Sequence, residues 1–225
     1  YLFANSEFPD SSWNTKIARD IFWEQSMHGI LQENAGVNLK DFQNEDEFFT
    51  NLSKSAIFTA KRGGQDYYFF PIPAIDYLSH EKIEAYNLSG ERVELTPKQE
   101  DFENHRSYQY QDLTTRGTIE FRSVCAQPFD RTFISAAFHL GILANLENVQ
   151  KYLQEADFFK EEGRNYKQLR RKFSQKETSE NSATNVRNFS SNLIQLAIAG
   201  LVTRNYGEES YLYDLIAKAK ENKKS

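Results

Sequence analysis

The sequence predicts an α+β protein in which an antiparallel sheet region is followed by a helical region. Residues 1–128 contain short runs of β-branched and aromatic residues separated by glycine turns, which is typical of strands joined by hairpins. Residues 129–225 instead carry apolar residues at helical spacing. We therefore expect a sheet region over residues 1–128 and a helical region over residues 129–225 that packs on it.

The composition is that of a folded chain. Of its 225 residues, 39% are hydrophobic and 14% aromatic, which indicates a core built on large rings. The mean hydropathy is −0.69 and no apolar run reaches the roughly 20 residues that span a bilayer, so a membrane protein is excluded. The single Cys excludes an internal disulfide and, with no visible signal peptide, predicts a cytoplasmic protein. The net charge of −5 disfavours general nucleic-acid binding, which depends on neutralising phosphates.

The first six residues, Tyr-Leu-Phe-Ala-Asn-Ser, form an apolar run with no polar lead-in. Natural termini are usually polar and loosely held. We therefore expect a strand at this point, and we interpret the chain as a piece of a longer protein that begins inside its sheet.

Two hairpins are predicted in the sheet region. Residues 56–61 and 66–71 flank Gly63-Gly64, and residues 83–86 and 92–95 turn at Ser89-Gly90. Helices are expected over residues 15–25, 41–53 and 96–105, the last with an N-cap at Thr96, and a strand over residues 117–124.

The helical region is expected to begin at an Asp130 N-cap. Residues 133–146 are apolar almost all round, which predicts a buried helix, and an amphipathic stretch follows to about residue 155. Further along we expect a basic helix over residues 163–173, a loop over 175–185, a helix over 186–204 capped near Gly207, and a frayed tail from Lys218.

The best candidate site lies on the strand around residues 117–124. Because strand side chains alternate, Glu120 and Arg122 share one face, while Ile119 and Phe121 share the other, which should face a core. A glutamate offers hard oxygen ligands for Mg²⁺, and an arginine offers a planar fork for carboxylate or phosphate. The alternative is a solvent-exposed strand with an ion pair of little energetic value.

Arg19 and Trp23 are a second candidate pair, since residues four apart share one helix face. They would combine an anion-binding group with an aromatic wall. The alternative places Trp23 in the core and Arg19 at its rim. The four histidines lack the spacing of a zinc site, and Cys125 is expected to be a buried, inert thiol. The basic segment 164–173 either contacts triphosphate or nucleic acid, or is a solvated helix face with two apolar anchors.

Four short motifs follow one another along the chain. They are Phe3-Ala4-Asn5-Ser6-x-Phe8, Arg19-x-x-x-Trp23, Phe102-x-Asn104-His105, and Arg116-Gly117-x-Ile119-Glu120-Phe121-Arg122 followed by Gln127-Pro128. In this order they resemble the C-terminal half of glutamate–cysteine ligases of the plant and bacterial type, and the resemblance covers roughly residues 1–145.

The resemblance implies a glutamine-synthetase-like catalytic fold and an ATP- and Mg²⁺-dependent ligase of glutathione biosynthesis. Such an enzyme activates the γ-carboxylate of glutamate as an acyl phosphate, which the amino group of cysteine attacks. By the family's pattern, Glu120 is a metal ligand, Arg122 contacts phosphate or the bound carboxylate, and Arg19 with Trp23 helps to form the amino-acid pocket. His105 and Arg116 match family positions and are given a supporting role.

The sequence departs from the family's pattern at two places. Cys125 stands where family members usually have Asp, and residues 24–29 replace an acidic stretch that normally ends Arg-x-Gly. The remaining metal-binding glutamates belong to an N-terminal half that is missing here, so this chain alone should be inactive. The alternatives are a related ligase with a different acceptor amine, a non-catalytic binding module that kept the fold, and a DNA-binding protein.

Overall fold

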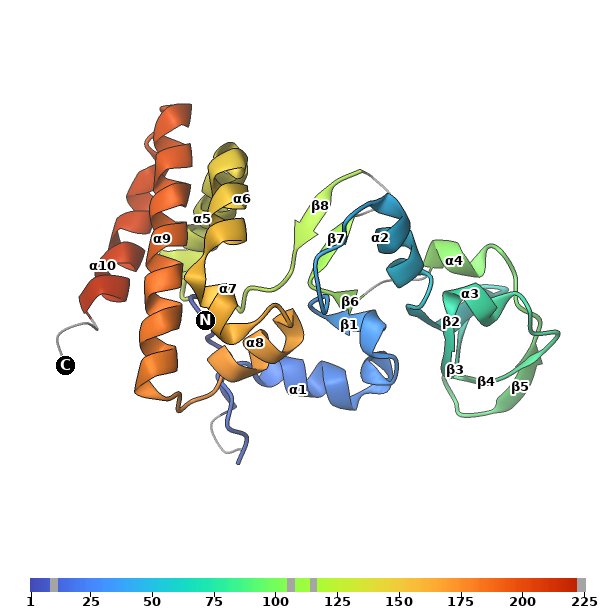
Figure 1. The fold of residues 1–225 in the computed structure, drawn as a ribbon. Helices are drawn as coiled ribbons and strands as arrows, with labels where there is room; N and C mark the ends of the chain where they lie inside the picture. Colours follow the sequence, from blue (N-terminus) through green and yellow to red (C-terminus); the bar gives the residue numbers. More distant parts are fainter. Residues whose placement is uncertain (9–11, 105–107, 114–116, 222–225) are drawn as a thin grey trace. The chain divides into compact units, whose positions relative to one another are not determined.

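The computed structural model describes residues 1–8, 12–104, 108–113 and 117–221, and it has the mixed helix and antiparallel-sheet content of an α+β protein (Figure 1). The chain forms two compact units. The helical unit comprises Tyr1–Ala18 and Val124–Ser225, and the sheet unit comprises Arg19–Ser123. The first 18 residues thus belong with the helices and not with the sheet region that the sequence suggested. The backbone N–H of Lys16 donates to the Ser174 carbonyl at 2.6 Å, which ties this segment to the helical unit.

Four antiparallel strands form the main sheet of the sheet unit, in the order β2-β3-β4-β5. They span β2 (Ala56–Arg62), β3 (Gln65–Pro73), β4 (Ile83–Asn87) and β5 (Arg92–Leu95). Gly63 and Gly64 have φ of 55° and 83°, which is the left-handed backbone that a two-residue hairpin turn requires. Both predicted hairpins are therefore confirmed.

A buried carboxylate fastens the chain after β5 to this sheet. Asp101 accepts two hydrogen bonds from the Arg62 guanidinium at 2.5 and 2.7 Å, one from the Tyr77 hydroxyl at 2.8 Å and one from the Lys98 backbone at 2.9 Å. Burial acts to raise the pKa of the Asp101 carboxyl, but these hydrogen bonds outweigh it and hold the pKa below its usual range. Tyr77, carried by α3 (Ala74–Tyr77), also stacks on Phe69 in the core of the sheet.

The remaining elements of the sheet unit are short. Helices α1 (Ala18–Gln25), α2 (Glu45–Leu52) and α4 (Asp101–Asn104) are all shorter than expected. The Asn44 side chain caps α2 and fixes its start. Helix α4 begins only at Asp101, so Thr96 does not cap it. The other pieces are η1 (Met27–Gly29), η2 (Gln32–Asn34), β1 (Ala35–Gly36), β6 (Tyr108–Gln109), β7 (Gln111–Leu113) and β8 (Ile119–Phe121).

The helical unit is built around α5 and α9, which lie side by side (Figure 1). Ala137 and Phe138 of α5 pack against Ile194, Ala197 and Leu201 of α9 in its main core. Its helices are α5 (Thr132–Ala144), α6 (Leu146–Glu155), α7 (Asp157–Glu162), α8 (Tyr166–Phe173), α9 (Glu180–Arg204) and α10 (Tyr213–Glu221), with short turns η3 (Phe129–Arg131) and η4 (Glu208–Leu212).

Two glycines allow α5 and α9 to approach at backbone distance. A Cβ atom on Gly141 would fall closer than 3.0 Å to the backbone of Ala197, and one on Gly200 would collide with the Gly141 carbonyl oxygen. Atoms of the main chain cannot rotate away, so any side chain here must push the helices apart.

Several expected boundaries in the helical unit were wrong. Asp130 lies inside η3 and does not cap α5, and α5 is only half buried. The loop expected over 175–185 is partly helix, because the Ser179 side chain caps α9 six residues earlier than predicted. Asn205, with a φ of 58°, ends α9 in place of Gly207. Helix α10 covers the start of the expected tail, and residues 1–6 form a turn and one isolated bridge where a strand was expected.

Candidate functional site

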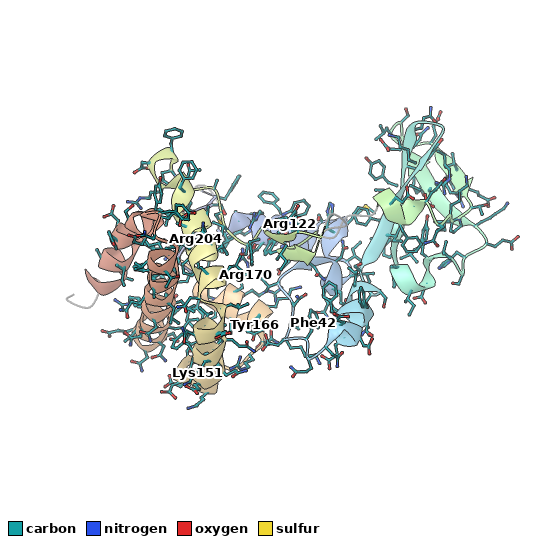
Figure 2. The ribbon with its side chains drawn as sticks, turned by 90° about the horizontal axis from the view of Figure 1, so that it is seen from above. Phe42, Arg122, Lys151, Tyr166, Arg170 and Arg204 are labelled. Atoms are coloured by element: carbon teal, nitrogen blue, oxygen red, sulfur yellow. The ribbon has the colours of Figure 1, made fainter. Side chains whose placement is uncertain are left out.

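Arg19 and Arg122 meet in the sheet unit although they are 103 residues apart in sequence. Arg19, the second residue of α1, donates from Nη2 to the backbone carbonyl of Arg122 at 2.9 Å. Its guanidinium also lies over the ring of Tyr110, 4.7 Å from the centroid. Arg122, labelled in Figure 2, directly follows β8. The side chain of Arg19 is thus fixed to the backbone at the end of β8, where Arg122 lies.

Tyr110 is the residue that holds this arrangement together. It lies between β6 and β7, where its backbone N–H donates to Gly36 at 2.7 Å and its carbonyl accepts from the Arg122 N–H at 2.6 Å. Its side chain is buried, and its hydroxyl donates to Asp20 of α1 at 2.6 Å. The side chain of Tyr110 therefore contacts α1 at Asp20 and Arg19, while its backbone carbonyl binds Arg122 at the end of β8.

Glu120 and Arg122 share one face of β8, as their spacing predicted. Glu120 Oε2 lies 3.4 Å from Arg122 Nε, and both side chains are partly exposed. The opposite face is not buried in a core, which corrects the sequence prediction, because Ile119 is 61% exposed. In the described residues β8 pairs only with β7, and a two-stranded ribbon lacks the second layer needed to bury its apolar side chains.

Trp23 lies in a neighbouring aromatic cluster. Its ring and that of His28 form a T-shaped pair with a centroid distance of 4.6 Å, and His28 forms a second such pair with Phe58 at 4.9 Å. Ser26 Oγ lies 3.0 Å from His28 Nδ1, and burial lowers the pKa of the His28 imidazole. Trp23 is half buried. Arg19 and Trp23 therefore share a helix, and each has its own set of contacts.

The structure brings together three of the six predicted site residues: Arg19, Glu120 and Arg122. Trp23 lies one helical turn after Arg19. His105 and Arg116 lie outside the described residues, so their supporting role stays a prediction. Sequence reasoning missed Asp20, whose place beside Arg19 in α1 was the available signal. It also missed Tyr110, and no local pattern could reveal that residue, because its role depends on strand pairing.

These side chains are suited to holding an anion. The Arg19 guanidinium reaches the backbone of Arg122, whose own side chain lies beside Glu120, and the buried Nε of Arg19 has no hydrogen-bond partner among the described residues. In that same part of the chain, no three His, Cys, Asp or Glu side chains come close enough to hold a metal ion by themselves. Glu120 nevertheless fits one ligand position of Mg²⁺, which usually takes one or two carboxylates and completes its shell with water and phosphate.

The other candidates lie in the helical unit. Cys125 is buried, as expected, with its Sγ 3.3 Å from Ser6 Oγ. The basic segment forms α8, on which Figure 2 labels Tyr166 and Arg170, and its Phe173 and Leu169 pack in a small core with α7 and α9. This packing agrees with the alternative of a solvated face with apolar anchors. A cavity of about 280 Å³ in this unit is lined by none of the predicted site residues.

Within the described residues, every helix is too short or too polar to cross a bilayer. Comparison of the chain with protein-family models and with curated proteins found no match. The functional assignment therefore depends on the residues of the site and on the resemblance of its motifs.

Proposed function

We propose that this chain is part of an ATP-dependent carboxylate–amine ligase that joins the γ-carboxylate of glutamate to the amino group of cysteine. The observation that carries the proposal is that Arg19 of α1 is hydrogen-bonded to the backbone of Arg122, whose side chain lies beside Glu120 of β8. They come from two separate motifs of the family resemblance. A chance resemblance in sequence would give no reason for these motifs to meet in space.

The chemistry of the three side chains suits this reaction. A ligase of this kind moves a phosphoryl group from ATP to a carboxylate oxygen, and the amine then displaces phosphate from the acyl carbon with loss of a proton. Both steps pass through anionic groups that need fixed positive charge. The Arg122 guanidinium would hold the phosphate or carboxylate, and Glu120 would hold Mg²⁺, which neutralises phosphate charge when bound.

Arg19 would act beside them in binding the amino-acid substrate. Its stacking on Tyr110 and its hydrogen bond to the Arg122 carbonyl fix the guanidinium before any ligand arrives. A pre-positioned group loses little entropy on binding, which favours tight and oriented substrate binding. Trp23 would form an apolar wall one turn further along α1.

A second candidate function differs from the first only in the amine that accepts the glutamyl group. The segment after Trp23 departs from the family's pattern, and in the structure it places the His28 ring against Trp23. A changed wall beside the amino-acid pocket favours a second candidate, a ligase that joins glutamate to an amine other than cysteine. Both candidates consume ATP, and only the first requires cysteine.

Substitution of Glu120 tests the site in the full-length protein. Glu120→Gln keeps the shape of the side chain and removes the charge that Mg²⁺ needs, so glutamate-dependent ATP turnover should fall by a factor of about 100 or more. Glu81→Gln is the matched control, because Glu81 is an exposed glutamate of the sheet unit and lies outside the site. Wild-type turnover in Glu120→Gln would remove this residue from the metal site.

A further inference from the structure

The helical unit contains a cavity of about 280 Å³ that lies outside the candidate site. Its walls include parts of the chain that are far apart in sequence, namely residues 1–4, the start of α5 and helix α10. At roughly 30 Å³ for each water molecule of the liquid, the cavity has room for a ligand of about ten non-hydrogen atoms. This is the size of a single small metabolite.

Part of the cavity wall is apolar. Leu2, Phe3, Ile134 and Leu215 line it, and all four side chains also pack against the main core of the helical unit. Side chains that pack on a core have little freedom to move, so this wall keeps its shape without a ligand. An apolar group placed against the wall would be removed from water, which is a main source of affinity for small molecules.

Three charged residues, Lys16, Arg131 and Asp214, line the same cavity. Among the described residues, their side chains form no hydrogen bond or ion pair, either with one another or with any other group. All three are accessible to solvent, and therefore to a ligand in the cavity. An apolar wall combined with a few polar groups is the usual composition of a small-molecule site. Here the polar groups are two cations and one carboxylate.

The wall around these charges is fixed by hydrogen bonds. The backbone N–H of Lys16 donates to the Ser174 carbonyl at 2.6 Å, and the Lys16 carbonyl accepts from the Ser6 N–H at 3.0 Å. Gln127 donates from Nε2 to the Phe3 carbonyl at 3.2 Å, which holds the first residues of the chain in the wall. The cavity is thus formed before a ligand arrives, and a preorganised site loses little entropy on binding.

We propose that this cavity binds a free amino acid with an apolar side chain, such as phenylalanine or leucine. The carboxylate of the ligand would pair with Lys16 and Arg131, its ammonium group with Asp214, and its side chain would lie on the apolar wall. A zwitterion is favoured over a simple anion because the Asp214 carboxylate would repel an anion. It is favoured over a simple amine because Lys16 and Arg131 would repel a cation.

A ligand in this cavity would be an effector and not a substrate of the proposed ligase. Arg19, Glu120 and Arg122 belong to the sheet unit, and none of them lines the cavity, which is built from residues of the helical unit. The inference therefore does not depend on the proposed function, and failure of either one leaves the other standing.

Calorimetric titration of the full-length protein with L-phenylalanine tests the proposal. The full-length protein is used so that any segment before Tyr1, which lines the cavity, is present. We expect saturable binding of L-phenylalanine. The dissociation constant should be higher by about tenfold or more for 3-phenylpropionate, which lacks the ammonium group, and for 2-phenylethylamine, which lacks the carboxylate. Glycine, which lacks the apolar side chain, should bind more weakly by a similar factor.

Charge substitutions test whether the ligand lies in this cavity. Asp214→Asn should weaken binding of L-phenylalanine by about tenfold or more and should not weaken binding of 3-phenylpropionate. Lys16→Gln should likewise weaken binding of L-phenylalanine and should not weaken that of 2-phenylethylamine. Lys151→Gln is the matched control, since Lys151 is an exposed lysine of α6 that does not line the cavity.

Three results would overturn the proposal. The first is the absence of saturable binding of both L-phenylalanine and L-leucine. The second is binding that Asp214→Asn and Lys16→Gln leave unchanged, because the amino acid would then bind elsewhere in the protein. The third is equal affinity for L-phenylalanine and 3-phenylpropionate, which would contradict the pairing of the ammonium group with Asp214.

Discussion

The contact between α5 and α9 gives a prediction whose sign is unusual. Replacing a glycine inside a helix by alanine normally stabilises a protein by about 0.5–1 kcal/mol, because alanine is the better helix former. Gly141 lies in the interior of α5, so propensity alone predicts a gain for Gly141→Ala.

The structure predicts that Gly141→Ala lowers the stability of the protein. The new Cβ would lie closer than 3.0 Å to the backbone of Ala197, and the carbonyl it meets belongs to a helix that packs along its length. Moving α9 away would loosen contacts of Ile194 and Leu201 in the main core. Overpacking of this kind costs about 1–3 kcal/mol, so after the helix gain we expect a net loss of about 1–2 kcal/mol.

Urea unfolding followed by circular dichroism measures this loss. Ala136→Gly on the exposed side of α5 serves as the control, because it should cost only the helix propensity, about 1 kcal/mol. Gly200→Ala should be as destabilising as Gly141→Ala, since its Cβ would meet the Gly141 carbonyl. An increase in the stability of Gly141→Ala would refute the close approach of the two helices.

Four further predictions concern buried polar groups. Asp101→Ala leaves the Arg62 guanidinium without its carboxylate and should cost about 3–5 kcal/mol in urea unfolding; a cost below 1 kcal/mol would show that the network is not stabilising. The lowered pKa of Asp101 means that its stabilisation is present above the unfolded pKa of about 3.9 and is lost as the pH falls through the folded value, a loss that Asp101→Asn should remove from an acid titration. Burial lowers the pKa of His139, so stability should fall as the pH drops below about 6.5, and His139→Gln should flatten that decline in thermal melts at pH 5 to 7. Tyr110→Phe breaks the bond to Asp20 and should cost about 1–2 kcal/mol and reduce ATP turnover; unchanged turnover would separate Tyr110 from the site.

Local sequence signals predicted the hairpins because the geometry of each is decided within a few residues. Gly63 and Gly64 supply a backbone that few other residues adopt, so the turn and the register of its strands follow directly. Helix boundaries were harder to predict, because several neighbouring polar side chains can compete to cap the same helix end. Ser179 caps α9 and Asn44 caps α2, although Thr and Asp elsewhere looked equally suitable.

Contacts between segments that are far apart in the sequence could not be predicted from local patterns. Nothing in residues 1–18 indicates that they pack with the helices, and the strand-like apolar run at the start suggested the opposite. The exposure of Ile119 depends on which strands pair with β8.

Local patterns likewise predicted one part of the candidate site and missed another. Spacing placed Glu120 and Arg122 on one face, and the structure confirms it. Their approach to Arg19 followed only from the order of the family motifs, because helix α1 and strand β8 are joined by about a hundred residues of intervening chain. Tyr110, which links them, carries no signal of its own.

The most direct test of the proposed ligase is product formation by the full-length protein supplied with ATP, Mg²⁺ and glutamate, with and without cysteine. We expect release of ADP that requires cysteine, together with γ-glutamylcysteine identified by its mass. Release of ADP that ignores cysteine and responds to another amine would keep the ligase and replace its acceptor. No turnover with any amine, from a folded protein that still binds ATP, would contradict the ligase assignment and favour a binding module.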